Sequence, residues 1–203
     1  MPLRRPAACL GLALALLLPL RSLATTVEAP EFKELTDTAD YIVRGVVVDV
    51  SSEWREHEGR RYIASQVELE VLEVIRGTPP ARVVLELLGG RVGEDELVIE
   101  GAPRFYVGDE NIFFVRGNGR TIYPLVAIMH GVYPILHDFK TGQDHVLRSN
   151  GMPLYSEQDV SLPMTRLSSV KAKNPAALPM TADAFIRRVR HTPTRATYPA
   201  VEN

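Results

Sequence analysis

The chain has 203 residues, of which 45% are hydrophobic and 24% charged, and its formal net charge at pH 7 is −2. This balance supplies no basic surface for nucleic acid or anionic lipid, so neither is expected as a partner. The hydrophobic content supports one domain of roughly 120 residues with its own core, plus flanking segments.

Residues 1–24 have the pattern of a secretory signal peptide. Arg4 and Arg5 give a positive start, and the following stretch, Ala7–Leu20, carries no charge. Ser22-Leu23-Ala24 then places small residues where a signal peptidase cleaves. The apolar run is shorter than the roughly 20 residues that a membrane-spanning helix needs. We therefore expect cleavage after Ala24, no stable membrane span afterwards, and a periplasmic or secreted protein.

Cleavage would also remove Cys9, the only cysteine, together with three arginines and no acidic residue. The remaining chain has 20 basic and 25 acidic residues and is mildly acidic. Without cysteine it has no disulfide, thiol nucleophile or thiolate metal ligand. We expect a disulfide-free domain that is stabilised by its core and contains no cofactor.

The first predicted strands are the longest. Residues 41–50 are rich in β-branched side chains and predict a buried strand, with a short helical turn before it within residues 31–40. Residues 61–75 alternate between apolar and polar, as a half-buried strand requires. The alternation changes phase near Glu73, which predicts a β-bulge or strong bend there. Pro79-Pro80 ends the strand because proline donates no ladder hydrogen bond.

Shorter strands follow, and glycines mark nearly every connection between them. These connections are too short for crossover helices, so we expect an antiparallel sheet. Asp138–Gly142 is typical of a hairpin turn whose glycine has a positive φ. The pattern predicts an all-β fold, a small antiparallel OB-like barrel over residues 31–148. The shorter strands are predicted at residues 82–88, 97–100, 111–116, 121–128, 132–137 and 143–147.

Residues 149–203 are rich in proline and predict an extended tail with one short helix at residues 181–191. Thr181 is a typical N-cap for this helix. Phe185, Ile186 and Val189 form an apolar stripe along it, which we expect to pack on the barrel. The alternative is a helix that binds a partner.

No catalytic motif is present: the sequence lacks a Gly-x-Ser-x-Gly elbow, a His-Glu-x-x-His pair, a Walker loop and a dinucleotide fingerprint. His137 and His145 flank the predicted hairpin turn and are weak candidates for metal ligands, since imidazole is a common ligand. The alternative is an exposed hairpin that carries polar residues. We expect a protein that is not an enzyme.

Binding sites of small barrels lie on the loops at the barrel mouth. Two segments fit this description, the predicted loop at residues 54–60 and the turn-rich stretch at residues 89–105. The only tryptophan, Trp54, is either an anchor for a ligand or a cover for one end of the core. The candidate binding residues are Trp54, Arg55, His57, Arg60, Arg91, Arg104 and Phe105.

Several short blocks within residues 35–148 resemble a group of exported bacterial β-proteins that are similar to OB-like netrin and metalloproteinase-inhibitor (NTR/TIMP-like) modules. The blocks are residues 39–47, 74–77, 89–90, 101–105, 108–114, 130–133 and 138–142. The resemblance implies an OB-like fold. The inhibitors of that group chelate a protease metal through an N-terminal cysteine, and the chain expected after cleavage contains no cysteine.

These observations favour an exported, non-catalytic binding module whose partner is another extracytoplasmic protein. Two alternatives remain open from the sequence. The first is an inhibitor or chaperone of an exported protease, and the second is a metal-dependent hydrolase that uses His137 and His145.

Overall fold

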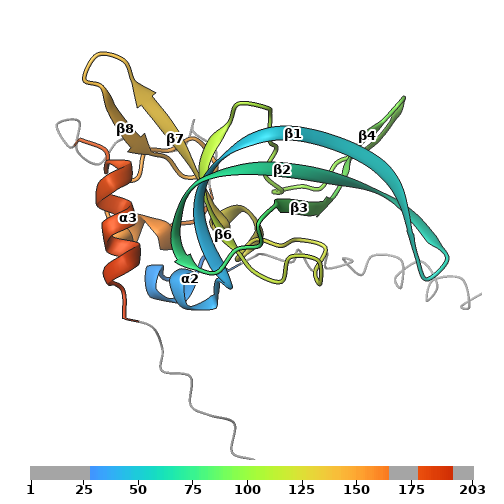
Figure 1. Ribbon diagram of the computed structural model, residues 1–203, viewed down its shortest axis with the longest axis horizontal. Coiled ribbons are helices and arrows are strands. Elements are labelled where there is room, and N and C mark those ends of the chain that lie inside the picture. The colour runs from blue at the N-terminus through green and yellow to red at the C-terminus, as the bar shows by residue number, and fades with distance from the viewer. Residues whose placement is uncertain (1–27, 165–177, 194–203) are drawn as a thin grey trace, which may run out of the picture.

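The computed structural model describes residues 28–164 and 178–193, so the predicted signal peptide lies outside the described residues. Six strands form one antiparallel sheet in the order β3-β2-β1-β6-β7-β8, and β4 and β5 form a separate two-stranded sheet (Figure 1). The prediction of an all-β antiparallel fold is confirmed at this coarse level: the described residues are mostly antiparallel β-sheet with two short α-helices, and their strand pairing does not close into a barrel. The elements are α2 (Phe32–Thr38), β1 (Tyr41–His57), β2 (Arg60–Gly77), β3 (Val83–Leu88), β4 (Gly90–Val92), β5 (Asp95–Leu97), β6 (Glu110–Val115), η1 (Ile128–Gly131), β7 (Val132–Asp138), β8 (Gln143–Val146), η2 (Glu157–Ser161) and α3 (Ala182–His191).

The two longest strands, β1 and β2, form a curved ribbon that arches over the rest of the sheet (Figure 1). Only Glu58 and Gly59 connect them, with φ values of 49° and 72°. The predicted loop at residues 54–60 is therefore wrong. Trp54 pairs with Ile63 within the ladder. A ribbon with both faces near solvent accepts charged residues, so the polar sequence did not end the strand.

Register shifts bend this ribbon. The β1–β2 ladder skips Leu72 and Ile75, one on either side of Glu73, and it skips Val48 on β1. The bulge predicted near Glu73 is confirmed. Each bulge adds one residue to one strand and increases the local twist, which lets a long two-stranded ribbon curve.

Two later strands were predicted wrongly. Residues 121–128 contribute only one isolated bridge, between Val115 and Leu125. Ala127 and Ile128 have positive φ values of 46° and 55°, which an extended strand does not allow. The strand predicted at residues 97–100 lies earlier, at Asp95–Leu97, where it pairs with β4. The first strand begins where predicted but continues seven residues past its predicted end at residue 50. The remaining predicted strands, at residues 61–75, 82–88, 111–116, 132–137 and 143–147, agree with the structure to within two residues at each end.

The sheet has a hydrophobic cluster on each face. Phe113 of β6 belongs to the cluster enclosed by the curved sheet, which includes residues of β1, β2 and β3. Its neighbour Phe114 points to the opposite face, where it meets Tyr133 of β7 and Phe185 of α3. Adjacent residues on one strand thus serve two different cores, as the period of two requires.

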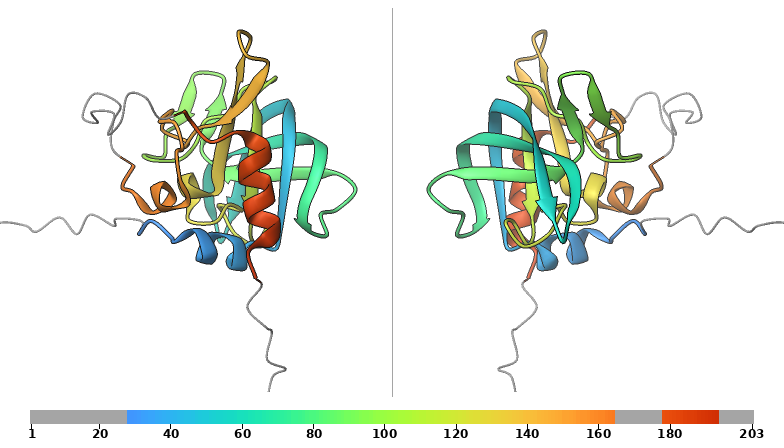
Figure 2. Two further views of the ribbon diagram at one scale, coloured as in Figure 1. Left: turned by 90° about the vertical axis from the view of Figure 1, so that its left-hand side faces the viewer. Right: turned by 90° about the vertical axis from the view of Figure 1, so that its right-hand side faces the viewer.

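Helix α3 lies across the second face of the sheet, beside α2 (Figure 2). It begins where predicted, and the Thr181 hydroxyl accepts a hydrogen bond of 3.3 Å from the Ala184 amide. The predicted packing of Phe185, Ile186 and Val189 is confirmed, since all three are buried. No helix of the described residues is long and apolar enough to cross a membrane.

Candidate functional site

A cleft of about 270 Å³ lies between the β1–β2 ribbon, the end of β3, and the segment from Gly89 to Tyr106. It contains three of the residues that the sequence analysis selected. One side is formed by strand residues, and the other by the β4–β5 hairpin and the chain that follows it. The residues that line the cleft include Val50, Ser52, Ser65, Val67, Leu87, Gly90, Arg91, Glu96, Ala102, Arg104, Phe105 and Tyr106.

The close approach of β4 to the ribbon shapes the cleft. A Cβ atom on Gly90 would lie 2.3 Å from the Ser65 hydroxyl and 2.4 Å from the Ser52 hydroxyl. The Ser65 hydroxyl donates to the Gly89 carbonyl at 2.7 Å, and the two serine oxygens are 2.9 Å apart. The Gly89-Gly90 pair therefore lets the chain cross directly over two serines, and this contact fixes one end of the cleft.

The floor of the cleft is apolar and continuous with the enclosed core. Phe105 is only 8% exposed, and its ring centre lies 5.7 Å from that of Phe113. Val67 and Leu87 are also buried members of this cluster. Phe105 was selected as a binding residue, and the structure places it in the floor, where it also packs as a core residue.

The rim of the cleft carries charges and an exposed aromatic ring. Glu96 lies 2.7 Å from Arg91 and 3.9 Å from Arg104, so one carboxylate is shared by two guanidinium groups. Both arginine side chains remain largely exposed. Tyr106 is 64% exposed beside them and was not among the binding residues predicted from the sequence. Its position directly after Phe105, within the turn-rich stretch at residues 89–105 and its continuation, is the signal that would have identified it.

The other candidate binding residues lie elsewhere. Trp54, Arg55 and His57 belong to β1, and Arg60 begins β2, so all four are near the far end of the ribbon. The Arg61 guanidinium lies 4.6 Å from the centre of the Trp54 ring, a cation–π contact. The structure thus divides the candidates into a cleft group and a ribbon-tip group, and only the cleft group lines the cleft.

His137 and His145 are separated by the alternation of strand β8. His137 pairs with Asp144 across the β7–β8 hairpin, and its ring contacts the Asp144 carboxylate. His145 points to the opposite face, where it is buried and its Nδ1 lies 3.1 Å from the Pro179 carbonyl. The hairpin therefore does not present the two imidazoles to one metal ion.

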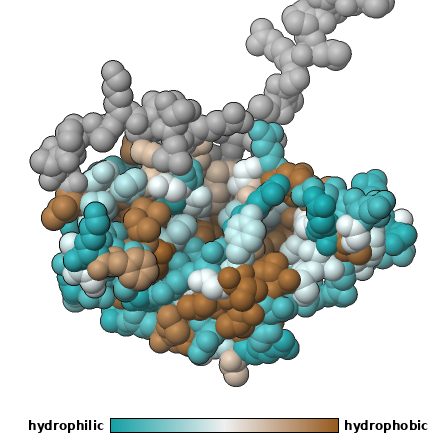
Figure 3. All heavy atoms as spheres, turned by 90° about the horizontal axis from the view of Figure 1, so that it is seen from above, coloured by the Kyte–Doolittle hydropathy of each residue, from teal (hydrophilic) through white to brown (hydrophobic). Residues whose placement is uncertain are grey.

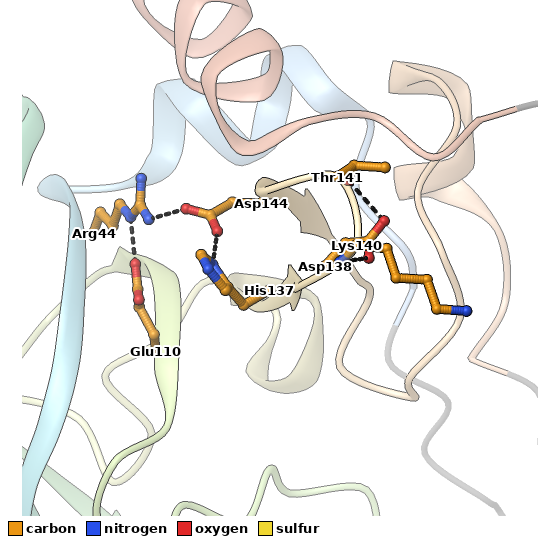
Figure 4. A network of polar contacts seen from close by, with 7 residues as sticks. All are labelled: Arg44, Glu110, His137, Asp138, Lys140, Thr141 and Asp144. Atoms are coloured by element: carbon orange, nitrogen blue, oxygen red, sulfur yellow. Dashed lines mark hydrogen bonds and ion pairs between the residues drawn. The ribbon is translucent and has the colours of Figure 1, made fainter.

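His137 is part of a polar network that connects four strands (Figure 4). Arg44 of β1 donates to Asp144 of β8 at 2.6 Å and to Glu110 of β6 at 2.5 Å. Burial opposes ionisation of Asp144, but the hydrogen bonds and charges of Arg44 and His137 outweigh it and lower the pKa of this carboxyl group. The network fastens the β7–β8 hairpin to the first strand of the sheet.

The tip of the same hairpin has the predicted turn. The Asp138 carboxylate accepts hydrogen bonds from the Thr141 hydroxyl at 2.7 Å and the Lys140 amide at 2.9 Å (Figure 4). These bonds lower the pKa of the Asp138 carboxyl group. Gly142 has a φ of 67°, as predicted for this turn.

A larger groove of about 980 Å³ lies between α2, η2 and α3. Its lining mixes both charge signs, and Arg188 of α3 is 2.9 Å from Glu157 of η2 within it. It contains none of the candidate residues selected from the sequence. Among residues 28–164 and 178–193, no group of three or more His, Cys, Asp or Glu side chains is arranged to hold a metal ion.

No protein-family model matches the chain, and a search of curated proteins gives no significant match. The resemblance to netrin and inhibitor modules stays a prediction.

Proposed function

We propose that this protein is an exported, non-catalytic binding module that holds a segment of another extracytoplasmic protein in the cleft beside Phe105. The proposed location rests on the signal-peptide pattern of residues 1–24. The strongly curved sheet supports an OB-like barrel as the fold. OB-like proteins bind ligands with one face of the sheet and with adjoining loops, which agrees with the position of the cleft.

One observation carries the proposal: an apolar floor is open to a rim that holds two exposed arginines. Binding sites commonly combine an apolar surface with a few polar groups that fix orientation. The three charged residues that line the cleft, Arg91, Glu96 and Arg104, carry a net positive charge. A ligand with an apolar side chain next to a carboxylate would match both the apolar floor and the positively charged rim of the cleft.

The predicted ligand is therefore an extended peptide segment in which an apolar residue is adjacent to Asp or Glu. The apolar side chain would contact Val67, Leu87 and Phe105. The carboxylate would lie at the rim and compete with Glu96 for the arginines. An inhibitor or chaperone of an exported protease would be one form of this function. No observation favours the hydrolase, since His137 and His145 face opposite sides of the hairpin.

Peptide selection tests this proposal. A phage-displayed library of random dodecapeptides would be selected against residues 25–203, and enriched peptides would be measured by calorimetry. Ala102 lines the cleft, so Ala102→Trp fills it, whereas Ala81→Trp places the same ring at an exposed position outside it. We expect peptides with an apolar–acidic pair, whose affinity falls about tenfold or more in Ala102→Trp and is unchanged in Ala81→Trp.

Arg104→Glu separates the contributions of floor and rim. This change reverses a charge at the rim and leaves the floor intact, so acidic peptides should bind about threefold to fivefold more weakly. Enriched peptides that bind Ala102→Trp and the wild type equally would refute the cleft as the site.

A further inference from the structure

A second surface, on the outer side of the β1–β2 ribbon, exposes hydrophobic residues that no helix of the described chain covers. Val47 and Leu69 point into the enclosed core, so their neighbours Val46 and Glu70, which face each other, point outward. Val48 and Leu72 are the bulged residues on either side of this pair, and they are 42% and 51% exposed. The bulges thus add two apolar side chains to the outside of the ribbon.

The chain before β6 extends this surface. The Gly108 amide donates to the Val47 carbonyl at 2.8 Å, which places Val107 beside β1, and Val107 is 66% exposed. We call Val46, Val48, Leu72 and Val107 the outer patch. Figure 3 shows the molecule from above, the side on which the β1–β2 ribbon arches in Figure 1. On this face hydrophobic residues form a continuous area with hydrophilic residues around it. Contiguous exposed apolar surface of this kind commonly marks an interaction site.

Carboxylates border the outer patch. Glu70 lies opposite Val46, and Asp49 follows Val48; both are exposed, and neither forms a salt bridge within the described residues. Arg82 interacts electrostatically with Asp49, but it is already paired with Glu68 at 2.6 Å, so this group of three charges stays negative. Glu73 and Glu110 also lie next to the outer patch, but each is paired with an arginine. Glu73 is 2.6 Å from Arg190, and Glu110 is 2.5 Å from Arg44. The border of the patch therefore carries net negative charge.

We propose that the outer patch is a docking surface for a basic amphipathic segment of a partner protein, with leucine-like side chains on Val48 and Leu72 and lysine or arginine near Glu70 and Asp49. Charge complementarity selects this occupant. A second copy of the chain would present the same apolar surface together with the same carboxylates, and facing carboxylates would repel. This surface shares no residue with the cleft, although Val107 directly follows Tyr106 of the rim, and the proposal does not depend on the function proposed for the cleft.

A synthetic probe tests this assignment. The probe is a fluorescent fourteen-residue peptide made of Leu-Lys-Lys-Leu-Leu-Lys-Leu repeated twice, and its counterpart has glutamate in place of lysine. Anisotropy titrations would use residues 25–203. Leu72→Ser should weaken binding of the basic peptide about tenfold through lost apolar contact, and Glu70→Lys about fivefold through charge reversal.

Two variants serve as controls. Leu178→Ser removes a highly exposed leucine outside the patch and should leave binding unchanged. Ala102→Trp fills the cleft and should also leave binding of the basic peptide unchanged. The experiment therefore tests the outer patch independently of the binding function proposed for the cleft. Equal binding of both peptides by Ala102→Trp, whose cleft is filled, no binding of the basic peptide, or normal binding by Leu72→Ser would overturn the proposal. Wild-type dimers in sedimentation that Leu72→Ser abolishes would overturn it too, because the occupant would be a second copy.

Discussion

Gly90 shows how a single residue positions the candidate site. Its φ of 135° lies in a region that residues with a side chain rarely adopt, and the Ser52 and Ser65 hydroxyls occupy the space that a Cβ atom would need. The sequence indicated a turn at Gly89-Gly90. The sequence does not show that Gly90 also lies against the Ser52 and Ser65 side chains. These serines are distant in the chain, so only the folded structure shows that a side chain at position 90 would collide with them.

We predict that Gly90→Ala lowers the free energy of unfolding by about 1–3 kcal/mol, because it adds both backbone strain and a steric conflict. Urea denaturation would measure this change. Gly93→Ala is the matched control: Gly93 has a φ of 62° but no atom lies within 4 Å of its ideal Cβ. Equal loss of stability in the two variants would show that contact with the serines has no role.

At the scale of elements, the β7–β8 hairpin depends on its connection to β1. Asp144 receives hydrogen bonds from Arg44 and contacts His137, and its pKa is lowered below the ordinary value of 3.8. A lowered carboxyl pKa means that the folded state favours the charged form. The resulting stabilisation is present above about pH 4 and is lost as the pH falls through the folded-state pKa.

Asp144→Asn should therefore lower the urea midpoint at pH 7 and have a smaller effect at about pH 3, below the ordinary carboxyl pKa, where part of the stabilisation is already lost. Asp95→Asn removes an exposed carboxylate that forms no salt bridge within the described residues, and it should change little at either pH. A difference between wild type and Asp144→Asn that is the same at both pH values would contradict the electrostatic explanation.

Helix α3 is the other element whose role depends on packing. Phe185 is fully buried, and its ring centre lies 4.9 Å from that of Tyr133 and 5.6 Å from that of Phe32. Phe185→Ala should lower the free energy of unfolding by about 3–5 kcal/mol through lost contacts and the cavity that remains. Arg187→Ala, an exposed change on the same helix, should cost far less, as urea denaturation of both variants would show.

The whole molecule has two hydrophobic clusters that share strands β1 and β6. Ile42 and Phe114 serve one cluster, while Val43 and Phe113 serve the other. Strands β1 and β6 contribute side chains to both clusters. If the packing of one cluster is lost, the strands that hold the other cluster in place are no longer fixed. The described parts of the predicted tail also take part, since Leu154, Val160 and Met180 are buried in the cluster beneath α3.

We therefore predict one cooperative unfolding transition. Trp54, the only tryptophan, lies near the end of the ribbon, so its fluorescence reports on that end, while far-UV circular dichroism reports on the whole sheet. The two signals should give the same urea midpoint. An earlier fluorescence transition would mean that the end of the ribbon unfolds independently of the two clusters.

Most of the strands, the helix at residues 181–191, the bulge near Glu73 and the turn at Asp138–Gly142 were predictable from the sequence, because each depends on a local pattern of side chains or on a backbone preference. The sequence also selected Arg91, Arg104 and Phe105. Tertiary structure decided which residues share a site. It placed Trp54 in a strand, outside the lining of the cleft, and turned His145 away from His137. Contacts between distant segments depend on register and curvature, and one-residue shifts at the bulges change which side chains face outward.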